Sequence, residues 1–132
     1  MLNEQRENYI RAIYLISSRN GAARGKDLSD YLKVSKNAVS AMLTQLRSEN
    51  YAVHEKYGAL SLTRKGASLA KKLTAKHRLI ELFLVKKLGH DPKEVHPEAC
   101  RLEHVFSRKS LSAMKRLLGN PKLDPHGQPI AR

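Results

Sequence analysis

Four side chains with metal-ligating atoms are closely spaced in one stretch of the sequence: His96, Cys100, Glu103 and His104. Because an α-helix turns by about 100° per residue, positions i, i+4, i+7 and i+8 fall within roughly 80° of one another. Imidazole, thiolate and carboxylate form a mixed donor set that suits Fe(II), Co(II), Ni(II) or Zn(II), whereas oxygen-rich sets suit Mn(II) or Mg(II). The spacing therefore predicts a transition-metal site on one helix face.

A second pair of candidate ligands, His77 and Glu81, lies upstream at spacing i, i+4. His77 falls close to the apolar stripe of a predicted long helix, where an imidazole ring needs a polar partner. Other interpretations stay open from the residues alone. A lone buried cysteine is more often a small hydrophobic residue than a ligand, and the pair also fits an ordinary ion pair within a helix. Six such residues on two neighbouring helices favour the metal site.

The elements that must position these side chains follow from apolar periodicity and turn residues. Pro97 marks a restart inside the fifth predicted helix, and in the second helix Leu28, Tyr31 and Leu32 are expected to point inward. The order of three helices followed by a hairpin is that of a winged helix, so the fold class is mainly α with a small β-hairpin. Helices are predicted over 4–18, 25–32, 35–50, 64–88, 92–106 and 108–118, and strands over 52–56 and 59–63.

Two short helices joined by a tight turn between Leu32 and Ser35 predict a helix-turn-helix, whose second helix fits the major groove of DNA. The outward face of that helix is small, polar and free of acids, and Asn37 is placed to pair with adenine. A polar helix face that is merely solvated is the competing interpretation. The residues expected to reach bases or phosphates are Ser35, Lys36, Asn37, Ser40 and Thr44, with Arg24, Lys26, Arg47 and Lys56 as phosphate contacts.

The composition also favours a polyanionic partner. The 132 residues include 25 Lys or Arg against 12 Asp or Glu, a net charge of +13. Ribosomal, nucleoid and membrane-surface proteins share this property, but tryptophan is absent and aromatic residues are 5%, which argues against stacking platforms for single strands. No apolar run approaches the roughly 18 residues of a membrane span. The amino-terminal segment is polar, so we expect no signal peptide, and a single cysteine fits a reducing, cytoplasmic compartment.

The chain resembles the diphtheria toxin repressor family of metal-dependent regulators, which includes the manganese transport regulators. The runs HPEACRLEH and DPHGQPI are the most specific part of this resemblance. It implies a winged helix-turn-helix DNA-binding domain (1–63), a helical dimerisation and metal-binding domain (64–119) and a connector tail (120–132), after which longer relatives continue into a small β-barrel domain. The segments that carry the resemblance are ENYIRAIYLI (7–16), LSDYLKVSKNAVSAMLTQL (28–46), LSLTRKG (60–66), KHRLIELFL (76–84), EVHPEACRLEHVFS (94–107) and NPKLDPHGQPI (120–130).

Carried over position by position, the resemblance implies two metal sites. Asn8 stands where relatives place Met or Asp, and Arg11 stands where manganese regulators carry a Glu ligand. The latter departure, together with a cysteine in place of a carboxylate at position 100, favours iron. Ala41 replaces a polar residue of some relatives, which predicts a different operator sequence. The implied primary site is Asn8, Cys100, Glu103 and His104, and the implied ancillary site is His77, Glu81 and His96.

The expected function is therefore a cytoplasmic, homodimeric repressor that binds palindromic operator DNA when loaded with Fe(II). Mn(II) is the second metal, and Co(II), Ni(II) or Zn(II) are expected surrogates. The ion would hold the first helix against the dimerisation domain and so fix the spacing of two recognition helices. One alternative is a metal-independent winged-helix regulator. Another is a small metallohydrolase, but we find no glycine-rich phosphate loop or nucleophile motif, so no enzymatic activity is expected.

Overall fold

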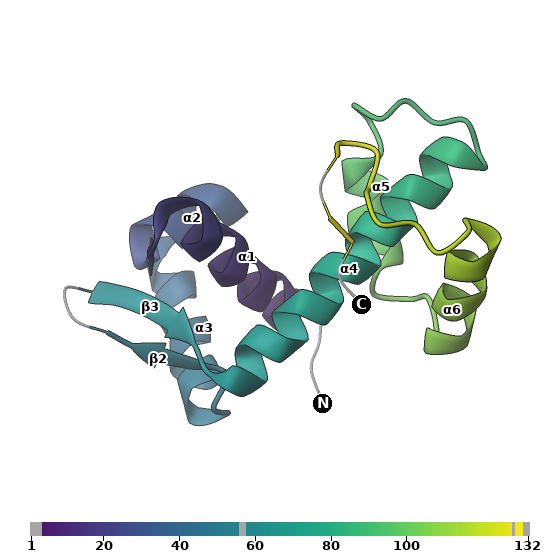
Figure 1. Cartoon of the computed structure of the whole chain (residues 1–132). Coiled ribbons are helices and arrows are strands. Elements are labelled where there is room, and N and C mark those ends of the chain that lie inside the picture. The colour runs from purple at the N-terminus through teal and green to yellow at the C-terminus, as the bar shows by residue number, and fades with distance from the viewer. Residues whose placement is uncertain (1–3, 56–57, 128, 131–132) are drawn as a thin grey trace. The chain divides into compact units, whose positions relative to one another are not determined.

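The computed structural model describes residues 4–55, 58–127 and 129–130. The chain divides into two compact units, residues 1–71 and 72–132, and helix α4 begins in the first unit and ends in the second (Figure 1). The elements are α1 (Glu4–Asn20), β1 (Ala23–Arg24), α2 (Gly25–Leu32), α3 (Lys36–Ser48), β2 (Ala52–His54), β3 (Ala59–Leu62), α4 (Arg64–Lys86), α5 (His96–Leu102) and α6 (Arg108–Leu117).

The first unit packs α1, α2 and α3 with a three-stranded antiparallel sheet of order β1-β3-β2. The predicted hairpin is present, with Val53 opposite Ser61, but its strands are shorter than expected. Sequence reasoning missed β1, in which Ala23 pairs with Leu60, because a two-residue strand has no periodicity to detect. The buried core of the first unit is formed by Ile10, Ile13, Leu28, Leu46 and other apolar side chains.

The turn between α2 and α3 is fixed by local hydrogen bonds. Lys33 takes a left-handed conformation with φ 57°, and the Ser29 hydroxyl donates to the Val34 carbonyl at 2.6 Å. Ser35 caps α3, because its Oγ accepts from the Ala38 amide at 3.0 Å. The inward placement of Tyr31 is wrong: its side chain is 43% exposed. A helix of eight residues buries a narrow stripe around Leu28, and Tyr31 lies at the edge of that stripe.

Helix α4 starts beside the residues that follow α3. Thr63 Oγ1 donates to the Asn50 carbonyl at 2.6 Å and accepts from the Gly66 amide at 3.1 Å, which caps the helix. Gly66 packs against the backbone of Tyr51 so closely that a Cβ atom would collide with the Tyr51 carbonyl oxygen. This close approach explains the glycine in the LSLTRKG segment.

The second unit packs the rest of α4 against α5, α6 and the tail. Helix α5 is shorter than the predicted 92–106 because Pro97 lies in its first turn, as expected, and residues 92–94 form a turn before it. The core of the second unit includes Ile80, Leu84, Ala99 and Met114. Among the described residues, no helix has the length and apolar character needed to cross a lipid bilayer.

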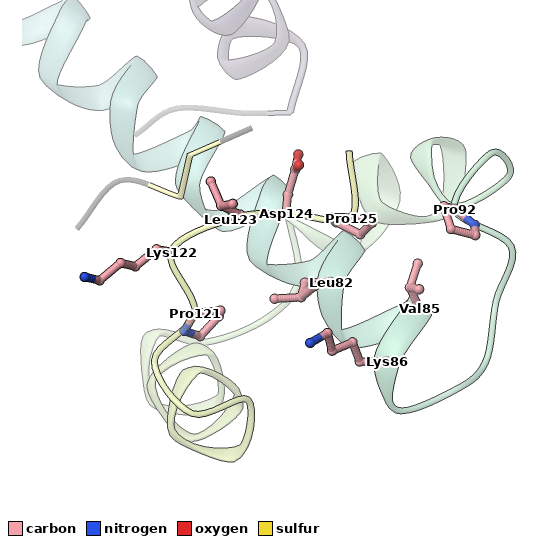
Figure 2. A pocket seen from close by; sticks show the side chains of 9 residues that line it. All are labelled: Leu82, Val85, Lys86, Pro92, Pro121, Lys122, Leu123, Asp124 and Pro125. Atoms are coloured by element: carbon pink, nitrogen blue, oxygen red, sulfur yellow. The ribbon is translucent and has the colours of Figure 1, made fainter. Parts of the chain in front are cut away.

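The described residues of the tail contact one another and helix α4. Leu123 and Pro129 form an isolated antiparallel bridge, and Arg78 Nη1 donates to the Pro129 carbonyl at 2.7 Å. A pocket lies between the end of α4 and the tail, lined by apolar residues together with Lys86, Lys122 and Asp124 (Figure 2). In Figure 2 the Asp124 carboxylate points away from Leu82, an apolar residue of this pocket.

Candidate functional site

Helices α4 and α5 bring the predicted ligands of the second unit together. His77 and Glu81 lie one turn apart on α4, with 3.3 Å between His77 Nε2 and Glu81 Oε2. His96 begins α5, and its Nδ1 atom lies 3.0 Å from His77 Nε2. The side chains of His77 and Glu81 are buried, whereas that of His96 is 61% exposed. The site is therefore enclosed on the α4 side and open at His96.

Cys100 lies beside the two histidines. Its Sγ atom is 3.4 Å from His96 Nε2 and 4.0 Å from His77 Nδ1. Ligand atoms of His77, His96 and Cys100 all lie within 4.8 Å of one another. The resemblance assigns the cysteine and the histidines to different sites, but the structure places their donor atoms in one group. We call His77, His96 and Cys100 the thiol cluster.

Glu103 connects the thiol cluster to His104. Glu103 Oε2 lies 2.9 Å from His77 Nδ1, and Glu103 Oε1 lies 3.4 Å from His104 Nε2. The Glu103 side chain is buried, and that of His104 is 9% exposed. Glu103 follows the last residue of α5 with helical dihedral angles, φ −62° and ψ −20°, so the helix face predicted from the spacing extends as far as this residue.

A second group of donor atoms was not predicted from the sequence. Ligand atoms of Glu81, Asp124 and His126 lie within 4.8 Å of one another, with 3.8 Å between His126 Nδ1 and Glu81 Oε1. The other nitrogen of this imidazole, Nε2, lies 2.7 Å from the Pro92 carbonyl oxygen, which identifies Nε2 as the donor and leaves Nδ1 for Glu81 and Asp124. The only signal was two ligand-type residues at i, i+2 in a Pro- and Gly-rich tail. We call Glu81, Asp124 and His126 the tail cluster.

The thiol cluster shifts the acidity of its own members. Burial lowers the pKa of His77, but hydrogen bonds with Cys100 and Glu103 outweigh it and raise this pKa to about 11. Hydrogen bonds with Cys100 and Glu81 raise the pKa of His96 to about 9. Burial raises the pKa of Cys100, yet hydrogen bonds with His77 and His96 lower it to about 6. These pKa shifts favour imidazolium and thiolate forms within the cluster at neutral pH.

Glu81 completes this balance of charge. Burial raises the pKa of its carboxyl group, but hydrogen bonds with His77 and His96 outweigh it and lower this pKa to about 2. In this arrangement, protonated histidines balance the charge of buried anions. A divalent cation can take the place of the histidine protons, because the ion supplies the same positive charge. The nitrogen, sulfur and oxygen donors match the ligands that divalent iron, cobalt, nickel and zinc take. The residues present thus fit a transition-metal ion.

Asn8, the remaining implied ligand, lies on α1 in the first unit. Its Oδ1 atom is buried and has no hydrogen-bond partner among the residues that the structure describes, which is the condition expected of an oxygen reserved for a ligand. Arg11 is half-buried on the same helix. The role of Asn8 as a metal ligand stays a prediction.

The predicted DNA-reading residues are all accessible where they are described. Ser35, Lys36, Asn37, Ser40, Thr44 and Arg47 are exposed along α3, and Arg24 and Lys26 are exposed near the start of α2. Lys56 lies outside the described residues. Helix α3 itself contains no acidic residue. Its exposed face therefore has the polarity that the phosphates and base edges of a major groove require.

Comparisons with known proteins agree with this architecture. The model for the iron dependent repressor N-terminal DNA binding domain matches residues 1–60, and that for the iron dependent repressor metal binding and dimerisation domain matches residues 63–132. An uncharacterized HTH-type transcriptional regulator of Methanocaldococcus jannaschii is 36% identical over 86% of this chain and 92% of its own length. The HTH-type transcriptional regulator MntR of Bacillus subtilis is 32% identical over 89% of this chain and 82% of its own.

Solved structures show the same fold. The structure of the manganese regulator SloR has a TM-score of 0.82 at 36% identity, covering 96% of this chain and 62% of that one. The structure of IdeR from T. acidophilum has a TM-score of 0.87 at 28% identity, covering 98% and 60%. This chain thus spans about three fifths of the length of the solved structures it matches. The family is one of transcriptional regulators rather than enzymes, and the chain belongs to it: the diphtheria toxin, or iron-dependent, repressor family of metal-dependent transcriptional regulators.

Proposed function

We propose that this chain is a cytoplasmic repressor that binds palindromic operator DNA as a homodimer when a divalent transition metal occupies the second unit. The observation that carries this proposal is the thiol cluster, whose three donor atoms lie within 4.8 Å of one another. Its members belong to the segment that matches a metal binding and dimerisation domain. The acid-free face of α3 in the first unit supplies the complementary surface for DNA.

We propose Fe(II) as the physiological metal. A thiolate and two imidazoles favour iron over manganese, which prefers oxygen ligands. Mn(II) remains the second option, because several similar structures are described as manganese regulators. Co(II), Ni(II) and Zn(II) are useful surrogates, and the similar regulator ScaR has been solved with bound Zn²⁺ and Cd²⁺.

The metal-free residues are arranged to accept the ion without a change in net charge. His77 and His96 carry the protons that balance Cys100 and Glu81. A bound divalent ion supplies two positive charges in their place. Each imidazole then presents a neutral nitrogen. Glu103 Oε2 stays beside His77 Nδ1 and orients its ring, as carboxylates commonly do for metal-bound histidines, and the other oxygen, Oε1, is the atom of Glu103 that would ligate the metal of the primary site. The side chains therefore need little rearrangement between the two states.

We propose that the tail cluster is an ancillary site linked to the thiol cluster through Glu81. The two oxygen atoms of this carboxylate face different groups: Oε2 lies 3.5 Å from His96 Nδ1, and Oε1 lies 3.8 Å from His126 Nδ1. One residue thereby connects α5 with the tail. The ligands implied by the resemblance, including Asn8 and His104, complete the primary site in this proposal.

A selection experiment tests the proposal. Duplexes are enriched from a random pool on the Fe(II)-loaded chain under anaerobic conditions, and affinities are then compared for wild type, Cys100→Ala and His104→Ala. We expect enrichment of a two-fold symmetric sequence and at least tenfold weaker binding by both variants at limiting Fe(II). His90→Ala is the matched control, because His90 lies in the same unit and its side chain is 41% exposed. Equal affinities for all four proteins would refute the proposal.

A further inference from the structure

Helix α6 carries an unusual distribution of charge. It contains Arg108, Lys109, Lys115 and Arg116 and no acidic residue. Among the described helices, only α3 and α6 contain neither Asp nor Glu. The whole segment 104–123 is free of acids. Residues 72–132 hold 13 Lys or Arg against six Asp or Glu, so the positive charge of the chain is not confined to the unit that carries the helix-turn-helix.

The four cations lie on one face of α6. At about 100° per residue they span roughly 120° around the helix axis, with Ser112 at the centre. Leu111, Met114 and Leu118 occupy the opposite side and pack into the core of the second unit. The cationic side is exposed, apart from Lys115, which is half-buried. We call Arg108, Lys109, Lys115 and Arg116 the α6 basic face.

Intramolecular contacts do not account for this face. Within the part of the chain that the structure describes, none of its four cations forms an ion pair or a side-chain hydrogen bond. Arg108 and Lys109 also lie in the first turn of the helix, where positive charge opposes the helix dipole and destabilises the helix. The folded chain itself therefore gains little from having these two residues there.

The start of α6 is built like the start of the recognition helix α3. In α3, Ser35 Oγ accepts from the Ala38 amide at 3.0 Å, and a lysine follows the cap. In α6, Ser107 Oγ accepts from the Ser110 amide at 3.0 Å, and Arg108 follows. The two helices differ in their amide side chains: α3 carries Asn37 and Gln45, whereas α6 has none. Amides read base edges, and cations and hydroxyls bind phosphates.

We propose that the α6 basic face binds the phosphate backbone of duplex DNA, as a contact surface separate from the helix-turn-helix and indifferent to base sequence. Four cations over about 12 Å of helix match the closely spaced charges of a duplex, which carries one phosphate per roughly 1.7 Å of its axis. Single-stranded nucleic acid fits less well, because α6 has no aromatic side chain on which a base would stack.

The proposal is tested with the full chain and a random-sequence duplex about three helical turns long, or roughly 30 base pairs. Affinity is measured against salt concentration for wild type and for Arg108→Gln, Lys109→Gln, Lys115→Gln and Arg116→Gln combined. The matched control removes the same charge elsewhere in the second unit, at four exposed lysines, Lys72, Lys86, Lys87 and Lys93. We expect the slope of log affinity against log salt to become less steep by about two to four for the α6 variant and by less than about one for the control.

Further measurements distinguish a loss of DNA contacts at α6 from effects of metal loading and from loss of folding. The slope difference is expected to persist in the presence of a chelator, so it does not depend on metal loading. The double variant Arg108→Gln, Lys109→Gln removes cations that oppose the helix dipole, so its thermal stability should not fall while its salt slope decreases by about one to two. Equal slopes for the α6 variant and the lysine control would overturn the proposal, as would a loss of affinity for single-stranded RNA without a loss for duplex DNA.

Discussion

The Cys100 thiol lies one helical turn from His96, with 3.4 Å between Sγ and Nε2. This pair joins a residue assigned by resemblance to a primary metal site with one assigned to an ancillary site. Both also contact His77 on α4, so the geometry favours a shared centre over two independent ones. The consequences for metal binding can be tested directly.

Removing the thiol should change the spectrum as well as the affinity. With Co(II) as a surrogate, wild type is expected to show a thiolate-to-cobalt absorption band in the near ultraviolet, and Cys100→Ser should lose it. Metal affinity should fall at least tenfold, the lower end of the effect seen for supporting residues at metal sites. His90→Gln serves as the control and should retain both properties. A band that survives in Cys100→Ser would place the thiol outside the coordination sphere.

Metal binding should release protons. The pKa values of His77 and His96, about 11 and about 9, lie above neutrality, so both are protonated at pH 7 in the metal-free protein. Cys100 and Glu81, with pKa values of about 6 and about 2, are already ionised. Only neutral imidazoles coordinate, so apparent affinity should rise with pH, by about tenfold per proton released and pH unit.

Calorimetry with Mn(II) in buffers of different ionisation enthalpy measures this release. About two protons per ion are expected at pH 7, falling toward one above pH 9, where His96 is already neutral. Binding that is independent of pH between 7 and 8, with no proton release, would show that these histidines are not ligands.

The tail cluster should contribute a separable part of metal binding. Asp124→Asn together with His126→Gln removes two of its three side chains and leaves the thiol cluster intact. We expect a lower metal stoichiometry, or at least tenfold weaker binding of the second ion. Elemental analysis after equilibrium dialysis measures both quantities. The cobalt–thiolate band should persist. Unchanged stoichiometry and affinity would assign the tail a structural role only.

Gly66 should be the glycine most sensitive to substitution in the first unit. A Cβ atom there would collide with the Tyr51 carbonyl oxygen, so Gly66→Ala should lower the free energy of unfolding by about 1–3 kcal/mol. Gly25→Ala is the matched control, because its Cβ would meet only Val39 Cγ1 at 4.0 Å. Chemical denaturation of both variants measures the difference. Equal stabilities would mean that the start of α4 can shift freely.

Most of the fold was predictable from the sequence, since α3 and α4 have long, regular apolar stripes. Where the structure differed, the local signal was weak. Strand β1 is too short to show alternation, and Tyr31 lies at the edge of a one-residue stripe. It was harder to predict which side chains of different helices lie together. Spacing on α5 placed Cys100 and His96 on one face, but their approach to His77 depends on how α4 and α5 pack.

The tail cluster was even less predictable from the sequence. Asp124 and His126 are 43 and 45 positions from Glu81 along the chain, and nothing periodic connects them. Their approach depends on the Leu123–Pro129 bridge and on the contact of Arg78 with the Pro129 carbonyl. Such long-range contacts leave no trace in a hydrophobic pattern, so only the donor chemistry of the DPHG run pointed to them.

Thermodynamic reciprocity between metal and DNA gives the most direct test of the central claim. If Fe(II) strengthens binding of the selected duplex by a given factor, the duplex must strengthen binding of Fe(II) by the same factor. Anaerobic Fe(II) titrations with and without saturating duplex measure this quantity. The account predicts tighter Fe(II) binding in the presence of the duplex, by about 5–150-fold. Identical Fe(II) affinities in the two titrations would contradict it.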